Sequence, residues 1–229
     1  MQIERLKLNN FRNYESLDVK FSNGFNVIVG DNAQGKTSVI EAVFLCTLGR
    51  SHRTPRDSEL IKYGCAGGYV GINLKNGTGD DSVEIKLRCN EKKKVFINKQ
   101  ECKKIGELMG VLNAVMFSPE DLSLVKGAPS ERRRFADMEL SQLYPDYFYS
   151  IQRYNKVLKQ RNIVLKDDEN NYGKGMISVW DEQLASLGTE ITLYRRDLID
   201  RLSTVASDIH KMISSSKELL IKKKIYLIL

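Results

Sequence analysis

The sequence predicts an α/β fold followed by a helical-hairpin arm. Three observations carry this prediction. Apolar and polar residues alternate in the first half, a glycine-rich segment joins a short apolar run to an apolar helix, and apolar residues recur at heptad-like spacing in the second half. We expect a head at residues 1–125, a helical arm at 126–216, and an atypical tail at 217–229.

The composition limits the class of protein. The chain has 229 residues, of which 41% are hydrophobic and 28% charged, which is ordinary for a globular protein. The charged start of the chain lacks a secretion signal, and no apolar run approaches the ~20 residues of a membrane span. The four cysteines form no CxxC pair, so we expect free thiols and a cytoplasmic location. A net charge of +7 permits a polyanionic partner.

The first half contains the strand signals. Residues 3–8 and 17–21 alternate in strand fashion and predict a hairpin. An apolar, buried helix is predicted at 36–48, and Ser118-Pro119 predicts the start of a later helix. Further strands are expected at residues 25–29, 69–74, 83–89, 95–98 and 112–117.

The second half has helical spacing. Pro145 can start a helix with apolar residues on one face, and a polar segment at 167–175 follows. The next apolar stripe runs from Trp180 to Met212. Two long helices joined by a short loop should pack as an antiparallel hairpin. A helical layer over the same core is the alternative, but the seam is too narrow to cover a sheet.

Residues 30–37, GDNAQGKT, fit the phosphate-binding pattern GxxxxGK[ST]. The glycines let backbone amides turn inward around phosphates, and the following helix directs its positive end at the same anion. Lys36 would reach the β- and γ-phosphates of ATP, and the Thr37 hydroxyl would bind Mg²⁺. A glycine-rich turn with a solvated lysine is the alternative. The predicted nucleotide-binding residues are Gly30, Asp31, Asn32, Ala33, Gln34, Gly35, Lys36 and Thr37.

Six further motifs occur in order along the chain besides the phosphate-binding loop, at residues 10–14, 49–54, 117–122, 127–137, 154–162 and 180–184. Over residues 1–196 the chain resembles the RecF family of bacterial recombination mediators, which are SMC-like, ABC-type ATPases. The resemblance implies an ABC-type ATPase head with Arg12 and Asn13 beside the nucleotide. It also implies an ATP-dependent homodimer that binds single-stranded and gapped duplex DNA. The implied partners are RecR, RecO and RecA, in DNA replication, repair and the SOS response.

One departure from the family concerns hydrolysis. ABC-type chemistry needs an SxGQ-like signature helix and an apolar strand that ends in paired acidic residues. Neither is found in this sequence; the late apolar run at 225–229 has no carboxylate after it. We therefore interpret the head as incomplete, the N-terminal portion of a longer pattern. We expect ATP binding with little or no turnover.

The basic residues of the arm predict contact with DNA. Residues 126–166 hold nine basic and four acidic residues, most of the net charge of the chain. A run of three arginines and two basic residues at helical spacing could contact phosphates. Alternatively, the arginines pair with Glu131, Asp137 and Glu139 inside the fold. The predicted DNA-binding residues are Arg132, Arg133, Arg134, Arg153 and Lys156.

Two other functions stay open from the residues alone. A small P-loop kinase or NTPase acting on a metabolite would share the loop, but it would not devote half of its chain to a hairpin. A non-catalytic remnant would bind DNA or a partner through the hairpin alone, and failure of the folded chain to bind ATP with Mg²⁺ would favour it.

Overall fold

The computed structural model describes residues 1–76, 79–166 and 177–214. The chain divides into two compact units, Met1–Met116 and a second that begins at Phe117, whereas the sequence pattern placed the start of the arm at residue 126. The expected tail at 217–229 and the polar segment at 167–175 lie outside the described residues. Over the described ranges, no helix is both long enough and apolar enough to cross a membrane.

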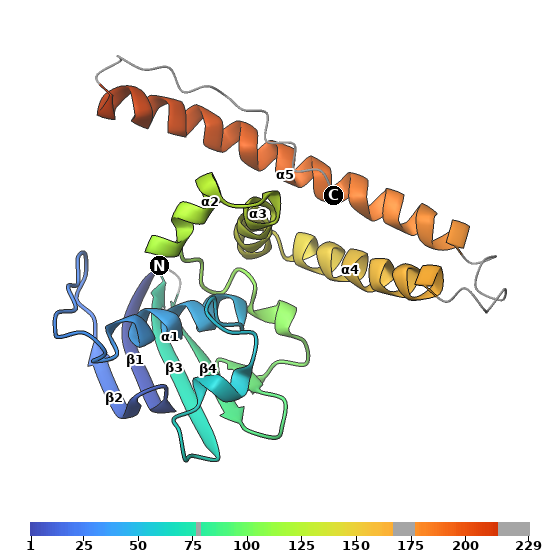
Figure 1. Ribbon diagram of the computed structural model, residues 1–229. Coiled ribbons are helices and arrows are strands. Elements are labelled where there is room, and N and C mark those ends of the chain that lie inside the picture. The colour runs from blue at the N-terminus through green and yellow to red at the C-terminus, as the bar shows by residue number, and fades with distance from the viewer. Residues whose placement is uncertain (77–78, 167–176, 215–229) are drawn as a thin grey trace. The chain divides into compact units, whose positions relative to one another are not determined.

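The first unit is built on one antiparallel sheet of six strands, in the order β2-β1-β3-β4-β5-β6 (Figure 1). The predicted hairpin is confirmed, since Leu6 pairs with Val19 and Leu8 with Leu17. The strands predicted at 69–74, 83–89 and 95–98 are also confirmed. The strands are β1 (Gln2–Phe11), β2 (Tyr14–Lys20), β3 (Gly67–Asn76), β4 (Gly79–Arg88), β5 (Lys94–Ile97) and β6 (Gln100–Glu101).

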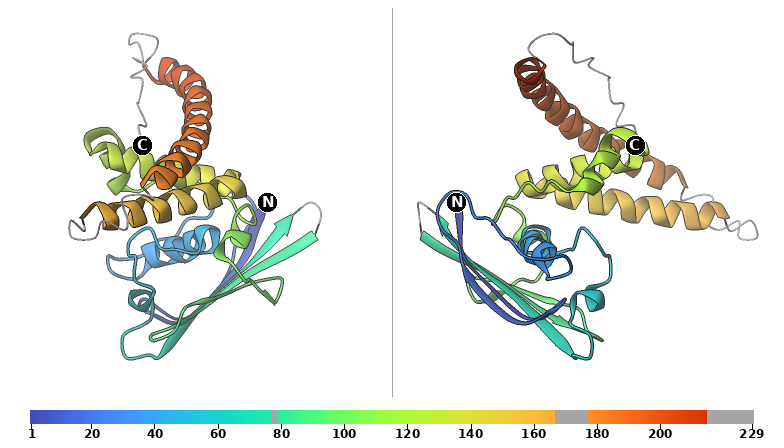
Figure 2. Two further views of the ribbon diagram at one scale, coloured as in Figure 1. Left: turned by 90° about the vertical axis from the view of Figure 1, so that its right-hand side faces the viewer. Right: turned by 60° about the vertical axis from the view of Figure 1, so that its left-hand side comes forward.

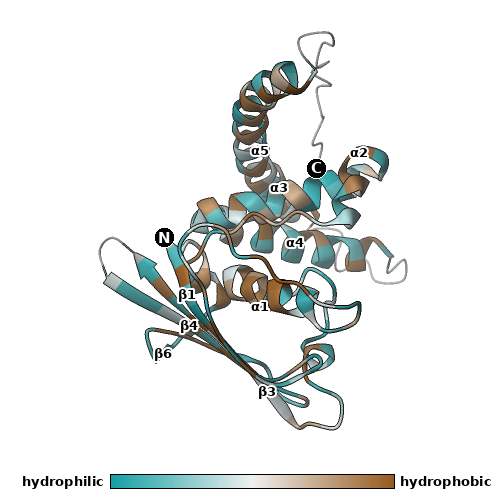
Figure 3. Cartoon of the chain, turned by 90° about the vertical axis from the view of Figure 1, so that its left-hand side faces the viewer, coloured by the Kyte–Doolittle hydropathy of each residue, from teal (hydrophilic) through white to brown (hydrophobic). Residues whose placement is uncertain are grey.

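One face of this sheet is covered by helix α1 (Lys36–Leu48), as both views in Figure 2 show. Alternate strand residues point to this face and are buried, among them Leu8, Val70 and Ile85. The residues of α1 are mostly hydrophobic, and Phe44 and Leu45 are buried (Figure 3). Two 3-10 helices, Asp57–Leu60 and Ile105–Leu108, complete the unit. The predicted α/β class and the helix at 36–48 are confirmed.

Two predicted strands were wrong. Residues 25–29 and 112–117 form no strand, and most of their large apolar side chains are exposed; Phe25 is fully exposed and Val115 is 83% exposed, whereas Leu112 is buried. An apolar run predicts burial, but a strand also needs a neighbouring strand to accept its backbone hydrogen bonds. Within the described ranges, neither segment has such a neighbour in the sheet.

The second unit is helical. A 3-10 helix begins at Pro119, where the sequence predicts a start, and the carboxylate of Asp121 accepts from the Ser118 backbone N–H at 2.6 Å. Helices α4 and α5 pack along each other, which confirms the hairpin, and α3 packs against both. The helices are Pro119–Leu122 (3-10), α2 (Ser123–Lys126), α3 (Pro129–Leu143), α4 (Pro145–Lys166) and α5 (Ile177–Ile213).

The core of this unit joins the three longest helices. Leu140 of α3, Tyr147 of α4 and Ile191 of α5 are buried together. The apolar stripe of α5 is covered as far as Leu198, which packs against this core. Beyond that point its apolar side chains are exposed, as Val205 is at 57%. Helix α5, with 37 residues, is longer than the 22-residue α4.

Candidate functional site

The glycine-rich loop lies just before α1. Its backbone has positive φ angles at Gly30 (152°), Ala33 (66°) and Gly35 (90°). Such changes in the sign of φ turn successive amides toward one side, which is the geometry of an anion-binding nest. At Gly35, an added Cβ would lie 2.9 Å from the ring of Tyr14. Both the φ angle and the lack of space therefore require glycine at this position.

The turn between β1 and β2 holds the loop by its carbonyl groups. The Asn13 amide donates to the Ala33 carbonyl at 3.3 Å, and the Tyr14 hydroxyl donates to the Gln34 carbonyl at 3.4 Å. In a trans peptide unit, N–H and C=O point in opposite directions, so the amides of Gln34 and Gly35 point away from this turn. Asn13 thus orients the loop, and its predicted contact with a nucleotide stays a prediction.

Lys36 folds back over the same loop. Its ammonium donates to the carbonyls of Gly30 and Asp31, both at 2.7 Å. The ammonium therefore lies beside the loop, where it could exchange carbonyl partners for phosphate oxygens. Because Lys36 is the first residue of α1, the amides of Lys36 and Thr37 have no acceptor within the helix, whereas Ser38 donates to the Gly35 carbonyl at 2.9 Å. Lysine, loop amides and helix terminus together favour a phosphate group.

Thr37 follows at the start of α1, and it is exposed. Mg²⁺ is usually held by one or two protein ligands together with phosphate oxygens and water. Within the described ranges, no group of three His, Cys, Asp or Glu side chains could hold a metal by itself. A hydroxyl beside a phosphate-binding loop fits the nucleotide-bound form of the ion, so Thr37 would hold Mg²⁺ and the ion would neutralise phosphate charge.

Arg12 is held by protein groups rather than turned toward solvent. Its guanidinium donates to both carboxylate oxygens of Glu41, at 2.9 and 2.6 Å, and to the Glu59 carbonyl at 2.7 Å. Glu41 lies on α1 and is fully buried, and Ser51 also donates to it at 2.5 Å. This network links the end of β1 to the helix that begins at the loop. The family resemblance implies that Arg12 lies beside the nucleotide; the structure gives it a role in placing α1, and its contact with a nucleotide stays a prediction.

The carboxyl of Glu41 is ionised within this network. Burial alone would raise its pKa, but hydrogen bonds from Arg12 and Ser51, with the charges of Arg12 and Arg53, outweigh burial. The net effect is a pKa below the usual 4.5. A negative charge is therefore fixed on α1 beneath the loop, paired with arginine.

We expect Glu41→Gln to lower the free energy of unfolding at pH 7 by about 3 kcal/mol, since a buried ion pair loses one partner. Because the folded-state pKa of Glu41 is lowered, its contribution is complete above the unfolded value and is lost as pH falls through the folded value. The difference between parent and variant should therefore narrow below about pH 4.5. Urea unfolding across pH measures this. The control is Glu101→Gln, which removes the carboxylate of an exposed pair with Lys94 and should change the free energy of unfolding little. A difference between parent and Glu41→Gln that does not vary with pH would contradict the ionised state of Glu41.

The predicted DNA-binding residues fall into two groups. Arg132, on α3, donates to the carbonyls of Leu124 and Gly127 at 3.3 and 3.0 Å, so it holds the preceding segment. Arg133 is half-buried and Arg134 is exposed on the same helix. The other two, Arg153 and Lys156, are exposed one turn apart on α4 and share one face. Their contact with DNA stays a prediction.

The sequence left open whether the arginine run pairs with Asp137, and the structure gives Asp137 other partners. Its Oδ1 accepts from the Arg195 guanidinium, at 3.0 and 2.7 Å, and from the Tyr147 hydroxyl. Burial, then the hydrogen bond to Asp137, raises the pKa of the Tyr147 phenol. Sequence reasoning missed this cluster, because the three residues come from three helices. The one signal was an arginine inside the apolar stripe of α5.

The sequence of this chain is similar to that of several known proteins. A family model described as an AAA domain matches residues 5–225. The DNA replication and repair protein RecF of Acetivibrio thermocellus is 48% identical over 223 residues, which cover 96% of this chain and 60% of the relative. RecF of Clostridium novyi is 46% identical, and the match covers 95% of this chain and 60% of the relative. The chain thus spans about 60% of the length of the curated relatives it matches.

Solved structures agree. A structure described as the recombination mediator protein RecF with ATPrS in the RecFOR pathway superposes with a TM-score of 0.88 at 33% identity. The match covers 93% of this chain and 58% of that one. A structure described under the structural biochemistry of ATP-driven dimerization and DNA-stimulated activation of SMC ATPases gives a TM-score of 0.51 at 23% identity. The match covers 59% of this chain and 98% of that one, and it supports the fold alone.

Proposed function

Since this chain belongs to the AAA domain family and is homologous to RecF over about 60% of that protein's length, we propose that it is the ATP-binding part of a RecF-like DNA replication and repair protein. The observation that carries the proposal is the loop at residues 30–35. The loop backbone, which turns through positive φ angles, lies next to both the Lys36 ammonium and the start of α1.

In this proposal ATP is bound by backbone amides and by Lys36, with Mg²⁺ held at Thr37. The carbonyl contacts from Asn13 and Tyr14 keep the loop amides free for phosphate oxygens. Glu41 fixes Arg12 against α1, so the helix terminus keeps its direction toward the phosphates. A structure of RecF described with ATP, matching at a TM-score of 0.88, supports the assignment.

The DNA-binding part of the proposal rests on α4. Arg153 and Lys156 present two cations on one exposed face, and neither is paired with a carboxylate in the ion pairs found for the described residues. We assign them to the phosphates of single-stranded or gapped duplex DNA. From the resemblance to the RecF family, we further propose that the chain forms an ATP-dependent homodimer and that its partners are RecR, RecO and RecA. We propose that it acts in recombinational repair and the SOS response, in the cytoplasm.

We expect the pair Arg153→Ala and Lys156→Ala to weaken DNA binding and to reduce its salt dependence. Each phosphate contact contributes a log–log slope of about −0.9 on duplex and about −0.7 on single strands, so the double variant should flatten the slope by about 1.4 to 1.8. Fluorescence anisotropy across salt concentrations measures the slope.

The matched control is Lys103→Ala, an exposed lysine of the first unit that should leave the slope unchanged. ATP affinity should be unchanged in both variants, because the loop is a separate set of residues. An unaltered slope in the double variant would remove α4 from the DNA contact and leave the ATP proposal intact.

A further inference from the structure

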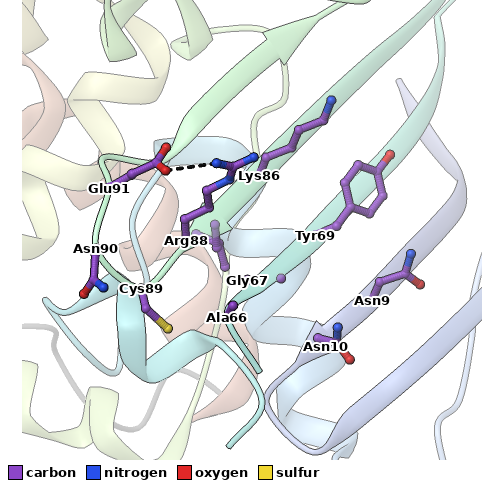
Figure 4. A pocket seen from close by; sticks show the side chains of 12 residues that line it. Asn9, Asn10, Ala66, Gly67, Tyr69, Lys86, Arg88, Cys89, Asn90 and Glu91 are labelled. Carbon is purple, nitrogen blue, oxygen red and sulfur yellow. Dashed lines mark hydrogen bonds and ion pairs between the residues drawn. The ribbon is translucent and has the colours of Figure 1, made fainter. Parts of the chain in front are cut away.

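The face of the sheet opposite α1 carries a hollow of about 770 Å³ (Figure 4). It lies where β1 ends, β3 begins and β4 ends, and it is lined by residues from all three strands. Among its lining side chains are the amides of Asn9 and Asn10, the ring of Tyr69, and the cations Lys86 and Arg88. Neither the loop at 30–35 nor the arm contributes to it.

Tyr69 is one of the residues that line the hollow. A Cβ built at Gly71 would lie 2.3 Å from the Tyr69 hydroxyl oxygen and 2.8 Å from Cζ, so the ring lies along β3 directly over Gly71. The ring therefore covers the backbone at Gly71, and Tyr69 borders the hollow. Partial burial, then the charge and hydrogen bond of Glu84, raises the pKa of Tyr69 to about 12, so the phenol stays neutral.

Cations and amides flank the ring on the neighbouring strands. Tyr69 pairs with Asn9 on β1 and with Lys86 on β4, and Lys86 pairs in turn with Lys94 on β5. Figure 4 shows the ring between Asn9 and Lys86. Lys86 Nζ also lies 4.5 Å from the ring centroid of Phe96. Four strands at a spacing of about 4.8 Å give this row a width of about 14 Å.

We propose that this outer sheet face binds single-stranded nucleic acid. An aromatic ring on the open face of a sheet can serve as a stacking platform for a base, and such platforms tolerate any sequence. The amides of Asn9 and Asn10 can donate to and accept from a base edge, and the cation of Lys86 can contact phosphates. Arg88 donates to Glu91, another lining residue, at 2.9 Å, and would contact a phosphate only by exchanging that partner. A row of this width extends beyond one base, which favours a strand over a free nucleotide.

This site goes beyond the proposed function, because it lies in the first unit and uses neither the loop nor α4. The test is a fluorescent oligo(dT) bound to the full chain, with ultraviolet cross-linking and peptide mapping. Tyr69→Ala should weaken binding by about 5- to 150-fold, the range found when a stacking aromatic is truncated. Tyr69→Phe should retain most of the affinity, and Lys86→Glu should weaken binding without touching the ring.

Tyr63→Ala is the matched control, because Tyr63 is a fully exposed tyrosine of the same unit that does not line the hollow. We expect it to bind like the parent, and we expect the cross-link at Tyr69. Circular dichroism confirms that each variant folds.

Any of the following results would overturn the site: cross-links confined to α4, affinities of Tyr69→Ala and Lys86→Glu equal to that of the parent, or displacement of the oligonucleotide by an equal nucleotide concentration of dTMP. Absence of any bound oligo(dT), as expected for a protein-docking face, would also overturn it. ATP binding measured on the same samples tests the loop separately, so failure of this site and failure of the nucleotide proposal are distinguishable.

Discussion

Replacing Lys36 with alanine should weaken ATP binding by about 10- to 150-fold while the chain stays folded. The ammonium lies beside the loop, 2.7 Å from two of its carbonyls, and would transfer to phosphate oxygens when ATP binds. A charge-assisted hydrogen bond contributes about 1.5 to 3 kcal/mol, which corresponds to this loss of affinity. Isothermal titration with Mg-ATP measures the loss.

The control for this experiment is again Lys103→Ala, which removes an exposed lysine of the same unit away from the loop. Thermal unfolding of Lys36→Ala should match the parent closely, because its two carbonyl contacts are exposed to solvent. Equal ATP affinity in Lys36→Ala and the parent would remove Lys36 from the site.

Asp137→Ala should destabilise the helical unit by about 3 to 5 kcal/mol, because it leaves a buried guanidinium without its counter-charge. Arg195 is only 3% exposed and makes two hydrogen bonds to Asp137. The same substitution removes the acceptor for the Tyr147 hydroxyl inside the core. Urea unfolding, followed by far-ultraviolet circular dichroism, measures the change.

Two further variants test whether the loss of stability comes from the unpaired buried guanidinium of Arg195. Asp197→Ala removes the carboxylate of an exposed pair with Arg201 on the same helix as Arg195, and should cost less than about 1 kcal/mol. The double variant Asp137→Leu with Arg195→Met replaces the buried pair by apolar groups and should recover much of the loss. Similar stability in Asp137→Ala and Asp197→Ala would contradict the account of the buried pair.

Local patterns carried much of the fold prediction. The hairpin of β1 and β2 and the helix α5 each have a periodicity that is visible in the local sequence, the helix α1 is apolar nearly all round, and each is present. The strands expected at 25–29 and 112–117 failed because strand formation depends on a distant neighbour, and an apolar run contains no information about that neighbour.

The candidate site also contains residues that the local sequence predicts and residues whose roles depend on distant parts of the chain. The loop at 30–37 could be found from the sequence, since glycine, lysine and threonine spacing reflects phosphate chemistry directly. The role of Glu41 could not, because its partners Arg12 and Ser51 are 29 and 10 residues away. Arg132 was grouped with phosphate contacts by its charge, yet it donates to backbone carbonyls, which a charge count does not reveal. The platform of Tyr69 depends on Gly71 beneath it and on strand register.

The central claim is that residues 30–37 bind the phosphates of ATP, and hydrogen exchange of the full chain with and without Mg-ATP tests it most directly. Bound phosphates should accept hydrogen bonds from the loop amides, so exchange at residues 31–38 should slow markedly when ATP is saturating. The sheet strands β3 and β4 serve as the internal reference and should exchange equally in both samples. Unchanged exchange at residues 31–38 under saturating ATP, or protection confined to another segment, would contradict the account.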